Sequence, residues 1–309
     1  MDESITLLKS SIKQRIVGKG DLIDKVIAAF LAGGHILLED VPGVGKTTLA
    51  KALADSLSLS FARIQCTPDT TPSDITGVSV YNSKEQIFET IPGPVVNNIV
   101  LVDELNRTSP KTQSALLEVM EENKVTIDGK EIEVPQPFLV IGTQNSTEQA
   151  GTYPLPESQL DRFMIRLNVG YPDREASVDM VSRFLHGSLH EKTTPVLSGD
   201  HIHSLKENVK EVTIKENLQE YAVAIVEKTR QDPQIFCGAS SRGLLSMLRF
   251  AQAWALLQER DYCIPEDIST AALLTIPHRL ILTPEARRNK VKKEDLMEKI
   301  LLQVSCHED

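Results

Sequence analysis

Several features are absent from the sequence, and each absence excludes a class of protein. Its 309 residues include four cysteines, and none of them forms a C-x-x-C pair. Sparse cysteines argue against a disulfide framework and indicate buried thiols in a reducing compartment. No apolar run approaches the roughly 18 residues of a membrane span, and the first twenty residues contain no long apolar signal region. We therefore expect a cytoplasmic protein without membrane insertion.

Positive charge is also scarce. The chain has 33 Lys and Arg against 43 Asp and Glu, a formal net charge of −10. Nucleic-acid backbones are bound by clustered Lys and Arg, so this balance argues against nucleic acid as a general partner, although a local basic pore surface remains compatible with it. The hydrophobic content of 41% and the length suit a globular chain with two domains.

What the sequence does contain is a phosphate-binding pattern, DVPGVGKTT, from Asp40 to Thr48. An apolar run at 35–38 precedes it and a helical pattern follows, which predicts a strand-to-helix turn. Pro42, Gly43 and Gly45 let successive amides point inward, and a helix N-terminus attracts phosphate. The first Gly of the usual G-x-x-x-x-G-K-[ST] pattern is Asp40 here.

Two side chains of this loop carry the predicted chemistry. Lys46 supplies a charge that reaches the β- and γ-phosphates, and Thr47 supplies a hydroxyl for Mg²⁺. The sequence therefore predicts a nucleotide site with bound Mg²⁺.

Polar residues end two further apolar runs. Residues 99–102 read as a strand buried on both faces, followed by Asp103 and Glu104. Downstream of a phosphate loop, Asp103 is the expected Mg²⁺-side carboxylate and Glu104 the candidate base that orients the attacking water. A second run, 138–143, ends near Asn145, which could bind the γ-phosphate or the water.

The pattern predicts an α/β core with a five-stranded parallel sheet, followed by a small all-helical domain. The expected strands are 35–39, 61–65, 99–102, 138–143 and 163–169. We place the core at 1–190, with hairpin inserts at about 66–98 and 124–137, and the helical domain at 191–309. One helical stripe is predicted from Leu244, Leu245, Leu248, Ala251 and Ala255. The second hairpin has an Asp128-Gly129 turn.

Taken together, these motifs resemble the MoxR family of AAA+ ATPases, in the clade with an insert in helix 2. The matching stretches are HILLEDVPGVGKTTLAKALA, TPDTTPSDITG, FETIPGPVVNNIVLVDELNRTSPKTQSALLEVMEE, PFLVIGTQNS, YPLPESQLDRFM and GASSRGL. Their order and spacing match over most of the chain. The resemblance implies a P-loop NTPase core and a small helical lid, acting as a hexameric ring that hydrolyses ATP.

The resemblance also implies residue roles. Ile16, Val17 and Gly18 would contact the adenine, although this stretch alone reads as an inter-helix turn. The loop residues Gly43, Val44, Gly45, Lys46, Thr47 and Thr48 would hold the phosphates. Asp103 and Glu104 match Walker B, and Asn145 matches sensor 1. Arg162 matches the arginine finger of a neighbouring subunit, and Arg242 matches sensor 2.

Three functions stay open at this point. The lead is a chaperone-like ATPase that remodels or activates a protein complex, with metal or cofactor insertion as one example. The resemblance suggests a von Willebrand A domain protein as its client. The alternatives are a DNA-linked motor and a nucleotide-gated scaffold that binds ATP with little turnover. A GTPase fits poorly because the guanine-reading N-K-x-D pattern is absent.

Overall fold

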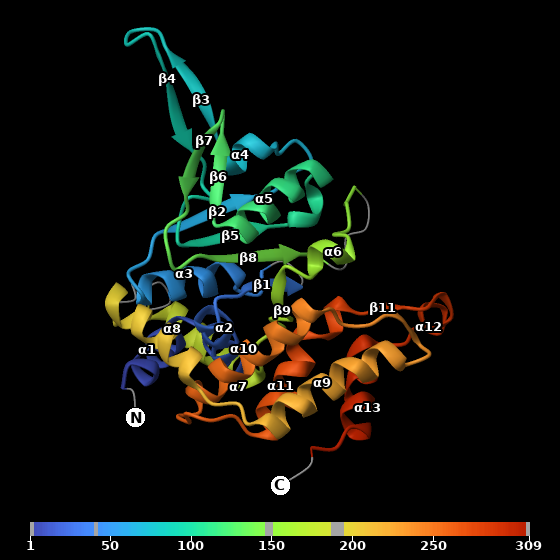
Figure 1. Ribbon diagram of the computed structural model, residues 1–309. Helices are drawn as coiled ribbons and strands as arrows, with labels where there is room; N and C mark the ends of the chain where they lie inside the picture. The colour runs from blue at the N-terminus through green and yellow to red at the C-terminus, as the bar shows by residue number, and fades with distance from the viewer. Residues whose placement is uncertain (1–2, 40–42, 146–150, 187–194, 307–309) are drawn as a thin grey trace.

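A computed structural model describes residues 3–39, 43–145, 151–186 and 195–306 of the chain. At its centre lies a five-stranded sheet with the strand order β2-β5-β8-β1-β9 (Figure 1). The strands are β1 His35–Glu39, β2 Phe61–Gln65, β5 Ile99–Asp103, β8 Leu139–Gln144 and β9 Phe163–Leu167. All pairings are parallel, which confirms the predicted sheet.

Helices cover both faces of this sheet, because successive strand side chains point to opposite sides. Ile99 and Leu101 of β5 belong to one hydrophobic cluster, and Val100 and Val102 belong to another. The first cluster contains α1 Glu3–Arg15, α2 Gly20–Leu31 and α3 Lys46–Ser56, and the second contains α5 Pro110–Glu122. The helix α5 begins at Pro110, and Ser109 caps it by accepting from the Thr112 N–H.

Two β-hairpins leave the core at the top of Figure 1. The longer one pairs β3 Gly77–Asn82 with β4 Ile87–Pro92, and it follows the short helix α4 Pro72–Thr76. The shorter one pairs β6 Lys124–Ile127 with β7 Lys130–Glu133. Its turn residues Asp128 and Gly129 have φ of 46° and 80°, so the predicted Asp-Gly turn is confirmed.

Six apolar side chains of the longer hairpin are between 40% and 65% exposed: Val78, Val80, Tyr81, Ile87, Phe88 and Ile91. An exposed apolar concentration of this kind is typical of an interaction surface.

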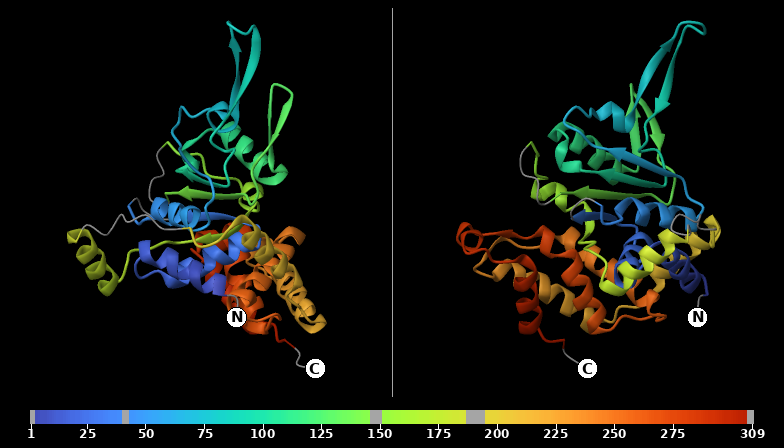
Figure 2. Two further views of the ribbon diagram at one scale, coloured as in Figure 1. Left: turned by 90° about the vertical axis from the view of Figure 1, so that its left-hand side faces the viewer. Right: turned by 180° about the vertical axis from the view of Figure 1, so that it is seen from behind.

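Three further elements lie between or after the sheet strands. The 3-10 turn η1 Leu105–Arg107 follows β5, the short helix α6 Glu157–Leu160 precedes β9, and α7 Arg174–Leu185 follows β9. In the left view of Figure 2, α7 stands apart from the body of the molecule, and Ala176 is its one buried residue among those described.

The C-terminal part is mainly helical. Its helices are α8 Gly199–Glu211, α9 Glu216–Gln231, α10 Ser241–Leu257, α11 Pro265–Thr275, α12 Pro284–Arg288 and α13 Lys293–Gln303, with the 3-10 turn η2 Pro277–Arg279. It also contains a small antiparallel ribbon of β10 Ile235–Cys237 and β11 Ile281–Leu282, which the sequence pattern did not predict. The predicted boundary between the core and the helical domain, at residues 190 and 191, lies outside the described residues.

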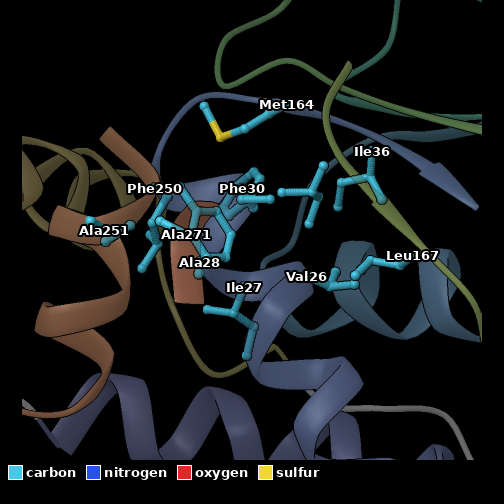
Figure 3. Packing of buried hydrophobic residues seen from close by; sticks show 14 of the residues in the cluster. Val26, Ile27, Ala28, Phe30, Ile36, Met164, Leu167, Phe250, Ala251 and Ala271 are labelled. Carbon is cyan, nitrogen blue, oxygen red and sulfur yellow. The ribbon is translucent and has the colours of Figure 1, made fainter. Parts of the chain in front are cut away.

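The C-terminal helices share a hydrophobic cluster with the sheet. Figure 3 shows Phe30 of α2 beside Phe250 of α10 and Ala271 of α11, with Ile36 of β1 nearby. This shared cluster seats the helical part against the core of the same chain. None of the helices in the described ranges combines the length and the apolar character that crossing a bilayer requires.

The predicted stripe of α10 is wrong at one position. Leu245 is 66% exposed, whereas Met247 and Phe250 are fully buried. Ala251 and Ala255 are buried as predicted. The helix packs between α2 and α11, so its buried surface spans two sides and includes small residues that a single apolar stripe does not identify.

Candidate active site

The candidate phosphate site lies at the C-terminal edge of the sheet, where open α/β sheets bind ligands. The turn after β1 and the residues that follow β5 and β8 meet there and line one open cleft of about 330 Å³. Its lining residues are Gly43, Gly45, Lys46, Thr47, Thr48, Arg63, Gln65, Asp103, Glu104, Thr143 and Asn145. The structure thus brings together the predicted phosphate loop, both predicted carboxylates and the predicted Asn145.

The phosphate loop has a backbone suited to an anion. Gly43 and Gly45 have φ of 86° and 94°, a region that L side chains rarely adopt. A Cβ at either position would meet open space, so the backbone conformation, and not packing, requires glycine. Gly45 precedes α3, whose N-terminus has no side-chain cap within the described residues. Its uncapped amides and helix dipole therefore fit a phosphate group.

The predicted phosphate-loop residues line two different cavities. Lys46 and Thr47 begin α3 and face the cleft. Val44 is nearly buried and lines a neighbouring cavity instead. Pro42 and Asp40 lie outside the described residues.

Asp103 is held from both sides of β5. Its Oδ2 accepts from Arg63 Nε on β2 at 2.8 Å, and its Oδ1 accepts from Thr143 Oγ1 on β8 at 3.1 Å. Arg63 is half-exposed, with 49% of its side chain accessible, whereas Asp103 is nearly buried. A carboxylate oxygen and the Thr47 hydroxyl are hard ligands that fit Mg²⁺. The guanidinium of Arg63 is therefore a cation beside the predicted metal ligand.

Glu104 is turned toward the cleft by an unusual backbone. Its φ of 58° and ψ of 45° are left-handed, a conformation that costs about 1–2 kcal/mol for a non-glycine residue. The Glu104 N–H donates to Thr143 Oγ1 at 2.9 Å, and its carboxylate accepts from Gln65 Nε2 at 3.2 Å and pairs with Arg107 at 3.2 Å. Strain of this kind collects at functional positions, which supports the predicted role of Glu104.

A second, more apolar cavity of about 470 Å³ continues from the phosphate cleft, with which it shares Gly43, Gly45 and Thr48. The predicted Ile16 and Val17 form one wall, and Tyr171 and Met180 form another. An apolar cavity beside a phosphate site suits a purine base.

Gly18, the third predicted adenine residue, lies behind this cavity. It has φ of 71°, and a Cβ there would lie 2.2 Å from Ala176 Cβ on α7. The neighbouring Lys19 Nζ donates to Val169 O at 2.7 Å and also to Gly170 O, which fixes the turn before Tyr171. Gly18 therefore allows the close approach of α7.

The two predicted arginines lie elsewhere. Arg162 precedes β9, and Phe163 pairs with His35, the first residue of β1. The phosphate loop follows the last residue of β1, four residues or about 13 Å further along the strand direction. Arg162 is therefore at the N-terminal edge of the sheet, opposite to its own chain's phosphate cleft.

Arg242 lies beside Arg162. Arg162 Nη1 binds Glu121 Oε2 at 3.0 Å, and Arg242 Nη2 binds Oε1 of the same carboxylate. Arg162 Nη1 also donates to Leu117 O at 2.7 Å. Arg242 thus does not contact the nucleotide cleft of its own chain, and the structure groups the two predicted arginines on one surface.

A buried ion pair supports this surface from the C-terminal part. Arg279, 6% exposed, donates to Asp161 Oδ1 at 2.7 Å and to Asp161 O at 3.0 Å. Ser240, the N-cap of α10, donates to the same Asp161 carboxylate at 3.4 Å. Asp161 directly precedes Arg162, so these contacts join the segments that carry both arginines.

Comparisons with known proteins show the family of this chain. Residues 35–165 match the ATPase family associated with various cellular activities (AAA), and residues 227–300 match the AAA lid domain. The chain is 38% identical over 303 residues to Chaperone MoxR1 of Mycobacterium tuberculosis, covering 95% of this chain and 80% of the relative. The chain belongs to the MoxR family of AAA+ ATPases.

Other relatives cover the chain equally well. The uncharacterized protein YeaC of Bacillus subtilis is 49% identical over 290 residues, covering 94% of this chain and 91% of that protein. A crystal structure of a candidate ATPase from Cytophaga hutchinsonii superimposes with a TM-score of 0.93 at 37% identity, covering 99% of this chain and 96% of the other.

Within this MoxR chain, the structure adds site residues that the sequence analysis missed. Arg63, Gln65 and Thr143 line the cleft and contact the two carboxylates, and Tyr171 and Met180 complete the apolar cavity. The phosphate loop was recognisable because its residues are consecutive. The missed residues come from other strands and from α7, and a local pattern does not identify them.

Proposed function

We propose that this MoxR-family chain hydrolyses Mg-ATP in an oligomeric ring whose active sites are shared between subunits. The proposal rests on the separation between the phosphate cleft and the two predicted arginines. The phosphate loop and both carboxylates line one cleft, whereas Arg162 and Arg242 lie at the opposite edge of the sheet. A second copy that presents this edge would complete the cleft. Repeated head-to-tail contacts of this kind close into a ring, and the resemblance suggests six subunits.

Five residues of the cleft have a role in this proposal. Lys46 and the first amides of α3 bind the phosphates. Thr47 and Asp103 would hold Mg²⁺, which would neutralise phosphate charge. Glu104 orients the attacking water and accepts its proton, and Asn145 hydrogen-bonds the γ-phosphate or the water.

The proposed pocket for the adenine base is lined by Ile16, Val17, Val44, Tyr171 and Met180. Gly18 shapes it from behind, as described above, by admitting α7. The family resemblance implies adenine contacts from residues 16–18, and Tyr171 and Met180 add a second wall to that pocket.

Energetics favour a shared site. Phosphoryl transfer depends on positioning and charge neutralisation, and an arginine finger contributes roughly 10³ to 10⁵ in rate. A subunit without a neighbour would lack both Arg162 and Arg242 at its cleft. Hydrolysis would therefore report assembly.

The biological role we propose is chaperone-like remodelling of a protein client in the cytoplasm, with a von Willebrand A domain protein as one candidate. The support is the exposed apolar residues of the β3–β4 hairpin, because apolar surfaces bind proteins. Stimulation of hydrolysis by a client protein would support this role, whereas stimulation by single-stranded DNA would favour the DNA-linked motor.

The first test is the ATP hydrolysis rate per chain with Mg²⁺, measured over a wide range of protein concentration. We expect the rate to rise steeply and then level off as sites are completed. The variant Lys46→Ala should lose ATP binding at every concentration. Binding without hydrolysis at any concentration would favour the scaffold, and full ATP binding by Lys46→Ala would remove Lys46 from the site.

The second test is subunit mixing. Glu104→Gln should bind ATP and assemble without hydrolysing it, and Arg162→Ala should also be inactive. In mixed rings, an intact cleft of Arg162→Ala meets an intact Arg162 of Glu104→Gln, so activity should recover. Well-mixed rings without recovery would exclude Arg162 as a residue supplied by the neighbour.

A further inference from the structure

The carboxylate of Glu121 joins two arginines from distant parts of the chain. Glu121 lies in the last turn of α5, Arg162 precedes β9, and Arg242 is in the first turn of α10. Each arginine binds a different oxygen of the carboxylate. The two arginines lower the pKa of Glu121, first through its hydrogen bond with Arg242 and then through the charges of Arg162 and Arg242, so the carboxylate is ionised at neutral pH.

Without this carboxylate, the two arginines would not hold this arrangement. Two guanidinium groups that bind the same carboxylate lie close enough to repel each other, and the anion between them offsets the repulsion. Arg162 has a second contact with Leu117 O, whereas the Arg242 guanidinium binds Glu121 alone among the side chains that the structure describes. Loss of Glu121 would therefore release Arg242 first and leave Arg162 with a single acceptor.

The same contacts are weak enough to be exchanged. The side chains of Glu121, Arg162 and Arg242 are 42%, 30% and 47% exposed. Ion pairs at such exposure contribute little to stability, because water competes for both partners. A phosphate group carries more charge and accepts two parallel N–H bonds from a guanidinium, so it can draw the arginines from Glu121.

We propose that Glu121 is a positioning residue, which holds Arg162 and Arg242 as one cationic pair for the nucleotide of the neighbouring subunit. This inference rests on the proposed function, because it requires a shared ATPase site. It adds a residue on α5 that contacts neither the nucleotide nor the attacking water. Glu121 orders the pair before assembly and thereby reduces the cost of orienting two flexible side chains during docking.

The variants Glu121→Ala and Glu121→Gln separate the negative charge of the side chain from its hydrogen-bond acceptors. Alanine removes both acceptors and the charge, and we expect turnover to fall on the order of 10- to 100-fold, as for other lost positioning contacts. Glutamine keeps one acceptor oxygen, so its loss should be intermediate. In both variants KM for ATP should stay near the wild-type value, because the phosphate cleft of the same chain is unchanged.

Glu118→Ala is the matched control. Glu118 lies one turn earlier on α5, has the same charge and lines the same small cavity beside Arg162. Its loss should leave turnover near the wild-type value. Melting temperatures of all variants show whether the fold is retained, and we expect no large change because the side chain of Glu121 is exposed.

Mixing decides whether Glu121 acts on the neighbour. Glu121→Ala mixed with Glu104→Gln should recover activity, because each Glu104→Gln subunit supplies an ordered pair to an intact cleft. Glu121→Ala mixed with Arg162→Ala should not recover, because neither subunit supplies the pair. A purely local defect in α5 would not give this pattern.

The outcomes separate the two proposals. If wild-type protein does not hydrolyse ATP, or if Arg162→Ala and Glu104→Gln do not complement each other, the shared site itself is wrong. If those results hold and Glu121→Ala turns over normally or faster, Glu121 does not position the pair. A slow Glu121→Ala that Glu104→Gln cannot rescue also overturns the inference.

Discussion

The guanidinium of Arg63 donates to Oδ2 of Asp103 at 2.8 Å across the neighbouring strands β2 and β5. This contact places a fixed positive charge beside the predicted Mg²⁺ ligand, where a guanidinium and a metal ion compete for the same carboxylate. The Mg²⁺ concentration that ATP hydrolysis requires should therefore depend on Arg63.

We therefore expect Arg63→Ala to lower the Mg²⁺ concentration that half-saturates ATP hydrolysis. Arg63 is half-exposed, so the ion pair contributes about 1 kcal/mol, which corresponds to a shift of about fivefold. Arg63→Lys keeps the charge and should shift the Mg²⁺ requirement less. An unchanged or higher requirement in Arg63→Ala would mean that Arg63 assists the metal site and does not compete with it.

Gly18→Ala should weaken ATP binding about tenfold, which is about 1.4 kcal/mol. The added Cβ would overlap Ala176 and displace α7 from the base cavity. Gly33→Ala is a matched control, because Gly33 also has a positive φ, 75°, but its Cβ would meet open space. Titration with a fluorescent ATP analogue measures both. Equal affinities of the two variants would disconnect α7 from base binding.

Protein stability should fall as the pH drops from about 6.5 to about 4. Burial lowers the pKa of His35 from 6.5 to about 4, so the unfolded chain binds a proton in this range that the folded chain does not. Stability is therefore complete above pH 6.5, and about 3 kcal/mol is lost by pH 4. His278, also buried with a lowered pKa, acts in the same direction.

The His35 hydrogen bonds explain this sign. Nδ1 accepts from the Val140 N–H, which leaves Nε2 to donate to Met120 O, so a neutral ring fits both partners. Denaturant midpoints across this range should become less pH-dependent in His35→Asn, whereas the exposed-site variant His186→Gln should keep the wild-type slope. A wild-type slope in His35→Asn would assign the acid sensitivity to other groups.

Asp161→Ala should destabilise the fold by about 2–4 kcal/mol. It leaves the buried Arg279 guanidinium without its carboxylate, and unpaired buried charges are costly. The value lies below that of a fully buried pair because Asp161 is 23% exposed. Glu294→Ala removes an exposed partner of Arg166 and should cost under about 1 kcal/mol. Similar unfolding midpoints for the two variants would contradict this account.

The sheet could be predicted from the sequence because its strands are continuous apolar runs. β5 is buried at all five positions, and such a run leaves few alternatives to a central parallel strand. The Asp128-Gly129 turn was equally local. By contrast, the exposed Leu245 shows where periodicity fails, because α10 packs on two sides and an apolar stripe marks only one.

The site was predictable where its chemistry is consecutive in the chain. Residues 43–48 and the pair Asp103-Glu104 carry their pattern within a few positions. The contacts of Arg63 and Glu121 join residues 40 or more positions apart, and each alone reads as an ordinary surface charge. The position of Arg242 beside Arg162 follows from how the C-terminal helices seat on the core, which no local motif specifies.

The β3–β4 hairpin projects from the core as a long arm (Figure 1). Six paired residues per strand give it a length of about 20 Å. Its base is tightly packed, because a Cβ on Gly77 would lie 2.3 Å from Ile91 O and one on Gly93 would lie 2.2 Å from Ile75 O. The adjoining α4 segment is tied to α5 through the Thr112 hydroxyl, which donates to Thr70 O at 2.9 Å. A small rotation of α5, the helix that carries Glu121, would therefore produce a larger displacement at the far end of the hairpin.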